Sequence, residues 1–133
     1  MANALLKAPY QGYEHKPHVV HVRIFPNGAS APTWSSNGGI ASVSRSAAGK
    51  FLVTFEHSYQ ALAVAQLTAH LTSDVVDSVA QGGDVSNLGT SSAATAVVKI
   101  KAGTSNTDLT ADPDNWIGCT YVFEDSDIGP VTG

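Results

Sequence analysis

The segment Lys50-Phe-Leu-Val-Thr-Phe-Glu56 carries the clearest strand pattern in the chain. Phe51, Val53 and Phe55 occupy alternate positions, and in a β-strand alternate side chains point to the same face. Aromatic and β-branched residues also favour a pleated, half-buried surface. The segment therefore predicts a β-strand that places these three side chains in a hydrophobic core.

Strand patterns recur on both sides of this segment. The pattern is clear at residues 18–25, where Val20, Val22 and Ile24 alternate with polar residues. The other expected strands are 40–45, 75–80, 95–101 and 116–124, and the last of these looks like a central strand. Residues 29–39 and 103–115 are expected to be loops, because Gly, Pro, Asn and Asp gather there. Six or seven short strands separated by turn signals predict an all-β fold, an antiparallel β-sandwich or jelly-roll-like domain.

Residues 59–71 fit two kinds of secondary structure. Tyr59, Leu62, Leu67 and Leu71 belong to a stripe with helical spacing, and Ala and Leu are good helix formers. The same stretch read as a strand places Ala63, Ala65, Leu67, Ala69 and Leu71 on one face. Periodicity alone does not decide between helix and strand here.

The length of 133 residues matches one ordinary domain. Residues 1–17 show no sustained period and contain Pro9, Gly12 and Pro17, which predicts an extended N-terminal arm. Residues 18–126 form the predicted sandwich domain, and residues 127–133 a C-terminal tail that frays.

The composition excludes some partners. The net charge is −4 with seven Lys plus Arg, and only Lys99 and Lys101 lie close together in sequence, so we expect no binding to nucleic acid. No apolar run approaches the roughly 20 residues that cross a bilayer, and the start of the chain does not resemble a signal peptide. The single Cys119 fits folding in a reducing compartment, so we expect synthesis in a cytoplasm and no membrane association.

Charged residues make up only 14% of the chain, against about 25% in a typical soluble domain. Such a surface has more apolar and hydroxyl area to offer to a partner protein. A mildly polar exterior of Ser, Thr, Ala and Gly is an equally good explanation of the same composition.

The histidines and aspartates do not form a recognisable metal site. His15, His18 and His21 are spaced by three, which on a strand places neighbours on opposite faces. The acidic run at Asp108, Asp112 and Asp114 could ligate Ca²⁺, but it lacks the EF-hand pattern. Because Asp also caps turns through its own backbone, we favour the turn interpretation.

The chain also lacks the motifs of common enzymes. No G-x-S-x-G, P-loop or G-x-G-x-x-G pattern occurs, and Cys119 lies inside an apolar strand, where a thiol is usually an inert core residue. We therefore expect neither catalysis nor a cofactor.

Four residues are candidates for partner binding: Tyr10, Tyr13, His15 and Trp34. They lie in segments predicted to be irregular, and exposed aromatic residues on loops often anchor protein interfaces or sugar-binding sites. Aromatic rings folded back over one end of the sandwich would fit the sequence equally well.

The order of the segments resembles that of small virion proteins of tailed bacteriophages. The resemblance begins with Gly38–Arg45, whose Ser-Val-x-Arg follows a glycine, and continues through the Val-Thr-aromatic pattern of Phe51–Phe55. Later parts match in order: an Ala-rich segment from Tyr59, a Val-rich segment at 97–100, Asp108-Leu109, and a last strand ending at 124–126. The resemblance covers roughly residues 18–126, and residues 1–17 have no counterpart in it.

This resemblance implies a trimeric β-sandwich or tulip-like module, and it favours a strand at 59–71. It further implies a decoration (cement) protein that binds the outer surface of the expanded capsid in the virion, with the major capsid protein as partner. A tail or fibre component is an alternative within the same group. A carbohydrate-binding β-sandwich module is an alternative outside it, since loop aromatics suit sugar rings.

Overall fold

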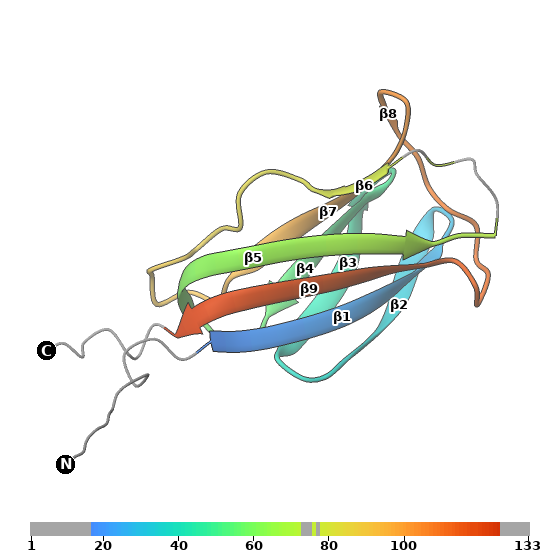
Figure 1. Ribbon diagram of the computed structural model, residues 1–133. Coiled ribbons are helices and arrows are strands. Elements are labelled where there is room, and N and C mark those ends of the chain that lie inside the picture. Colours follow the sequence, from blue (N-terminus) through green and yellow to red (C-terminus); the bar gives the residue numbers. More distant parts are fainter. Residues whose placement is uncertain (1–16, 73–75, 77, 126–133) are drawn as a thin grey trace, which may run out of the picture.

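The structure is a computed structural model that describes residues 17–72, 76 and 78–125 (Figure 1). Within these ranges the chain is all β and contains no helix. The strands are β1 (Pro17–Asn27), β2 (Ser30–Ser36), β3 (Ile40–Ala47), β4 (Lys50–Phe55), β5 (Tyr59–His70), β6 (Ser78–Gln81), β7 (Thr95–Ala102), β8 (Ser105–Asn106) and β9 (Trp116–Asp125).

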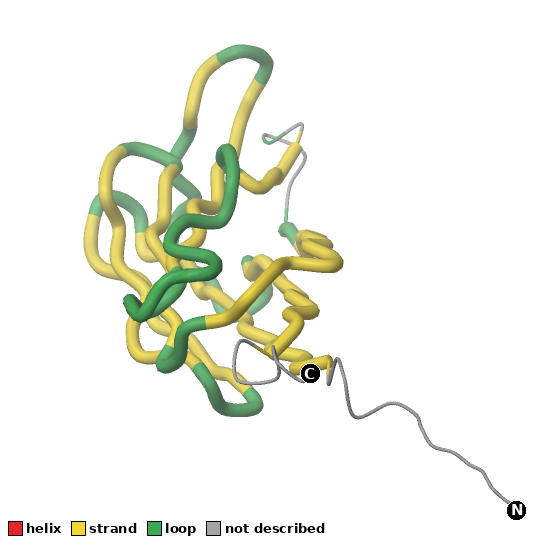
Figure 2. The backbone as a smooth tube through the Cα atoms, turned by 90° about the vertical axis from the view of Figure 1, so that its left-hand side faces the viewer, coloured by secondary structure: helices red, strands yellow, loops and turns green. Residues whose placement is uncertain are grey.

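The strands form two antiparallel sheets that pack face to face, as Figures 1 and 2 show. The first sheet has the order β2-β1-β9-β5. The second has the order β3-β4-β7-β6, and β8 pairs with β7 beside this path. The prediction of an antiparallel β-sandwich is therefore confirmed.

The core lies between the two sheets and is built from alternate residues of each strand. Phe51, Val53 and Phe55 of β4 are completely buried, as the opening segment of the sequence predicts. They face Val22 and Ile24 of β1, which are also buried. Burying a side chain of this size contributes roughly 1.5–3 kcal/mol. The alternation of apolar residues is thus sufficient to define the inner face of these strands.

Strand β9 is the centre of the first sheet, as its sequence predicts. It pairs with β1 on one side and with β5 on the other, so that Cys119 lies between Val22 and Leu67. Residues 59–70 are a strand, which settles the ambiguity of that segment. The paired backbone groups of β9 outweigh the helix propensity of Ala and Leu, which is a weak preference.

Several expected boundaries were wrong. Residues 29–39 are not a loop, because β2 occupies Ser30–Ser36 and pairs with β1 through the tight turn at Asn27-Gly28. Pro32 lies in this strand, and β2 is at the edge of its sheet, where the missing N–H of proline is tolerated. The short strand β8 lies inside the predicted polar loop 103–115.

Other predictions fall on parts of the chain that the structure does not describe. Of the expected strand 75–80, β6 covers Ser78–Gln81, while residues 75 and 77 lie outside the described ranges. Pro17 is the first residue of β1. The rest of the predicted arm, residues 1–16, and the predicted tail lie outside the described residues.

The turn between β3 and β4 is braced by a residue far away in the sequence. The guanidinium of Arg45 donates two hydrogen bonds to the Asp108 carboxylate, at 3.1 and 2.8 Å, and the backbone N–H of Gly49 donates a third at 2.8 Å. The bond from Arg45 lowers the pKa of Asp108, and the same contact raises the pKa of Arg45. The carboxylate thus stays charged and fixes the turn against the segment that precedes β9.

Candidate functional site

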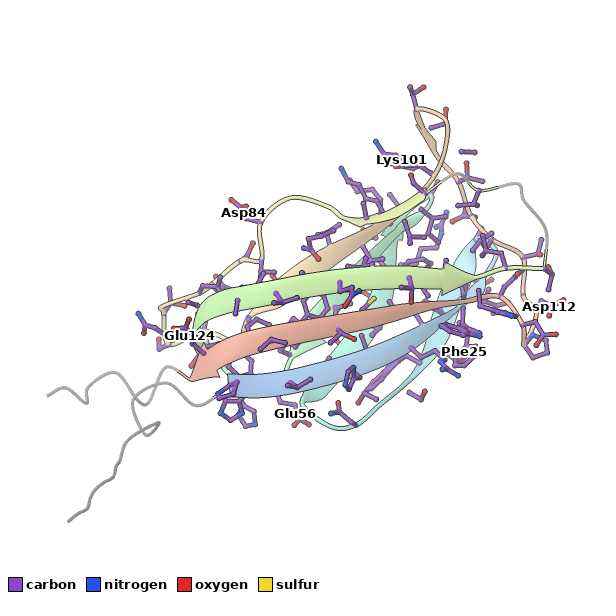
Figure 3. All side chains as sticks on the ribbon, viewed as in Figure 1. Phe25, Glu56, Asp84, Lys101, Asp112 and Glu124 are labelled. Carbon is purple, nitrogen blue, oxygen red and sulfur yellow. The ribbon has the colours of Figure 1, made fainter. Side chains whose placement is uncertain are left out.

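The outer face of the first sheet carries a row of exposed valines. Val19 of β1 and Val64 of β5 both pair with Val122 of β9, so the three side chains lie side by side across the sheet. Val19 and Val64 are each 47% exposed and are the large hydrophobic residues most open to solvent in the described chain. This valine row lies toward the Glu124 end of the face, and Phe25 marks the opposite end (Figure 3).

The face is also poor in charge. The four strands of the first sheet contain only three residues with charged side chains, Arg23, Glu124 and Asp125. Strand β5 contains none. A charge-poor patch with exposed aliphatic side chains costs little to desolvate, which is the property of a protein-binding surface.

Next to the valine row the face is hollowed and polar. A shallow hollow of about 540 Å³ is lined by residues including His21, Asn37, Gln66, Thr68 and Thr120. His21 Nδ1 lies 2.9 Å from the Thr120 hydroxyl, and the His21 backbone N–H donates to the Asn37 side-chain oxygen at 2.9 Å. These side chains present amide, hydroxyl and imidazole groups to whatever enters the hollow.

One side of the hollow is closed by a stack of three side chains. The Arg23 guanidinium lies 4.0 Å from the centroid of the Trp116 ring, and the His70 ring stacks on the same indole at 5.4 Å and 10°. Because β1 and β5 flank β9 on opposite sides, we infer that Arg23 and His70 cover opposite faces of the indole. His70 Nδ1 lies 2.6 Å from the Asp114 carbonyl oxygen, so this nitrogen carries the proton and donates.

Gly118 makes this stack possible. A Cβ atom at residue 118 would lie 3.2 Å from the Trp116 ring and 3.3 Å from the Thr68 hydroxyl. The glycine in this central strand is therefore explained by the indole that lies across it. Because Arg23 and His70 both contact the indole, less of its ring is open to a ligand.

The outer face of the second sheet carries a group of lysines, whereas the strands of the first sheet contain none. Lys50 of β4 lies directly opposite Lys99 of β7, and Lys101 follows on the same face of β7. The sequence showed only Lys99 and Lys101 as neighbours, because Lys50 is brought in by strand pairing. The sequence could have predicted this basic strip only together with the pairing of residues 50–55 with residues 95–101.

Of the four candidate residues chosen from the sequence, Trp34 is the one that lies in the described chain. Trp34 is on β2 rather than in a loop; its half-buried ring packs against the core, and its Cα pairs with Ile24. This placement of Trp34 agrees with the alternative interpretation, in which the aromatic ring folds back on the sandwich. Tyr10, Tyr13 and His15 lie outside the described residues.

The aspartates take two different roles. The Asp112 carboxylate accepts the backbone N–H of Asp114 at 2.8 Å, which is a turn contact as the sequence predicts. Asp108 instead binds Arg45. Among the described residues no group of three or more His, Cys, Asp or Glu could hold a metal ion.

Comparisons with known proteins found no similar protein. No protein-family model matches the chain, and neither the curated proteins nor the solved structures contain a significant match. In the described part of the chain no helix is long and apolar enough to span a membrane.

Proposed function

We propose that this protein is a structural virion protein of a tailed bacteriophage, a decoration protein that binds the outer surface of the expanded capsid. In this role it stabilises contacts between major capsid subunits. A ligand that binds only the expanded lattice stabilises that lattice by mass action. A homotrimer would suit threefold or quasi-threefold sites on the capsid, since the symmetry of an adaptor matches the site that it covers.

The observation that carries this proposal is the outer face of the first sheet. The valine row supplies exposed apolar area, and the polar hollow beside it supplies groups for hydrogen bonds at a rim. This arrangement of an apolar centre with a polar surround is common in protein interfaces. We assign docking on the capsid to this face rather than to the face with Lys50 and Lys99.

The first experiment is light scattering of the full-length protein, alone and mixed with expanded phage heads that lack it. The proposal predicts a stable trimer that saturates the heads and raises their melting temperature. A trimer that ignores heads would instead favour a tail or fibre component. A monomer indifferent to heads would contradict both assignments.

The docking face can be tested with matched charge substitutions. Val19→Asp combined with Val64→Asp places two charges in the valine row, at exposed positions that the core does not use. Ser42→Asp combined with Ser44→Asp adds the same charges to exposed positions of β3 in the other sheet. We expect the valine pair to weaken head binding by about a hundredfold or more, and the serine pair to leave it within about threefold of the parent. Equal effects would place the docking face elsewhere.

Carbohydrate binding is a second candidate, and the polar hollow is the observation that favours it. Its amide and hydroxyl groups suit sugar hydroxyls. Sugar rings usually stack on an open aromatic face, however, and Arg23 and His70 already stack on the Trp116 ring. A glycan array read together with Trp fluorescence tests this candidate. Binding that is lost in Gln66→Ala would support it, and a silent array would remove it.

A further inference from the structure

Three of the four sheet edges in the described chain are protected against pairing with another strand. Strand β2 contains Pro32, β3 is irregular at both ends of its pairing with β4, and β6 has only four residues. In addition β2 and β3 lie against each other and close one side of the sandwich. Proline, bulges and short length are the usual means of preventing edge-to-edge association.

Strand β5 has none of these protections over most of its length. It is the longest strand, with 12 residues, and it contains no Lys, Arg, Asp, Glu or Pro. Of the described strands only β9 pairs with it, so its other edge has no hydrogen-bonded strand; β6 of the second sheet lies near this edge without pairing with it. Its two register shifts lie near its start, between Tyr59 and Val64. Beyond these shifts the pairing with β9 is regular from Val64 to His70, and residues 63–70 form a long and uncharged edge.

The sandwich is also incompletely closed beside this edge. Leu62, Leu67 and Leu71 point inward on this side but are only partly buried, whereas the aliphatic residues of the central strands are fully buried. A cavity of about 500 Å³ lies between the start of β5 and the segment 81–88. The Gln81 Nε2 atom at this cavity is buried without a hydrogen-bond partner in the described chain. A strand added along residues 63–70 would lie beside Leu67, farther along β5 than this cavity.

We propose that residues 1–16 of a second copy of this chain pair with the open edge of β5. The segment joins β1 at the end of the sheet where β5 of the same chain starts, because Pro17 and Ala61 both pair with Glu124. Pairing along residues 63–70 needs roughly 26 Å of extended chain, and 16 residues span roughly 50 Å. About half of the segment is thus left to cross between copies.

A second copy is the better donor than the same chain. To reach its own β5 edge, the segment would have to cross the ends of β9 and β5, roughly 14 Å. The loop after β6 occupies that end of β5, where the Gly89 N–H donates to the Tyr59 carbonyl at 2.8 Å. A segment from a neighbouring copy need not cross this end of the sheet to reach residues 63–70. Each copy then donates one arm and accepts one, which is a heterologous contact; such contacts form a ring where the rotation between copies closes.

This inference concerns contacts between copies and is tested without any capsid, so its failure is distinct from failure of the decoration function. The test uses the full-length chain and two matched variants. Ala69→Lys charges the β5 edge, and Ala41→Lys places the same side chain on the β3 edge; both alanines are exposed. The measurements are light scattering over a range of concentrations, and hydrogen exchange of residues 1–16 and 63–70.

The expected result is an oligomer in which both segments exchange slowly and both lose protection on dilution. Ala69→Lys should raise the dissociation constant by more than about tenfold and remove both protections together, while Ala41→Lys leaves them unchanged. An oligomer that survives Ala69→Lys, or one in which residues 1–16 exchange freely, would overturn the proposal. Concentration-independent protection of residues 63–70 in a monomer would overturn it as well, since the chain's own arm would then cover β5.

Discussion

The ring of Phe55 meets the ring of Phe123 edge-on, with centroids 4.9 Å apart and planes at 80°. Phe55 belongs to β4 and Phe123 to β9, so this contact joins the two sheets. Tyr121 gives Phe55 a second edge contact at 5.2 Å, and Tyr59 stacks on Phe123 at 4.1 Å. Four aromatic rings thus hold the sheets together near the Glu124 end of the sandwich.

Removing the central ring of this cluster should destabilise the whole domain. We expect Phe55→Ala to lower the free energy of unfolding by roughly 3–5 kcal/mol, the usual range for a buried aromatic side chain. Phe55→Leu keeps most of the volume and should cost about 1.5 kcal/mol or less. Chemical denaturation measures both, and a loss below about 1 kcal/mol in the alanine variant would mean that the cluster does not couple the sheets.

Two glycines with the same backbone conformation should respond differently to alanine. Gly28 and Gly49 have φ of 57° and 63°, and a Cβ at Gly28 would meet nothing within 4 Å. A Cβ at Gly49 would lie 2.5 Å from the Thr107 nitrogen and 2.8 Å from the Ile100 oxygen. We expect Gly28→Ala to cost about 1–2 kcal/mol from the left-handed conformation alone. Gly49→Ala should cost at least about 1–3 kcal/mol more, because backbone must move. Equal losses in thermal unfolding would contradict the close approach at Gly49.

The brace at Asp108 should make stability depend on pH in acid. Its pKa in the folded protein is lowered, chiefly by the hydrogen bond from Arg45. Its stabilising effect is therefore fully present above the unfolded-state pKa of about 3.9 and is lost as pH falls through the lower folded value. Asp108→Asn should lower Tm near neutral pH and converge with the parent in acid. Asp84→Asn, at an exposed carboxylate, is the control, and a pH-independent Tm difference for Asp108→Asn would rule out the ionic contribution.

The thiol of Cys119 should be inert until the domain unfolds. Burial raises its pKa to about 12, and the residue is 2% exposed. Thiolate is the reactive form, so alkylation of the native protein at pH 8 should be slow and should follow unfolding as denaturant is added. Ser44→Cys, at an exposed position of β3, supplies a fast-reacting reference thiol in the same chain. Rapid modification of Cys119 in the native protein would show that β9 opens locally.

The sequence predicts some elements well and others poorly, for identifiable reasons. Strand β4 is predictable because large apolar residues, Phe51, Val53 and Phe55, occupy every second position along it. Strand β2 is missed because Pro32 and the surrounding serines are typical of loops, and only its pairing with β1 makes it a strand. Strand β5 is ambiguous because Ala and Leu fit both periods, and β9 decides it.

Less of the candidate site than of the fold could be predicted from the sequence. The exposed valines, the hollow beside Trp116 and the strip of Lys50, Lys99 and Lys101 each combine residues from different strands. Nothing in the local sequence marks them, because register between distant strands is not a local property. The candidate residues that local sequence did suggest were Tyr10, Tyr13, His15 and Trp34, and the one of these in the described chain packs against the core.

The sequence by itself determined the all-β class and the buried faces of the regularly alternating strands, because alternation of apolar side chains is a local pattern. Tertiary structure alone decided which strands became neighbours, and with them the charge-poor face, the Arg23–Trp116–His70 stack and the open edge of β5. The physical reason is that burial is set residue by residue, whereas a surface is assembled by hydrogen-bonded pairing of strands that lie far apart in the chain.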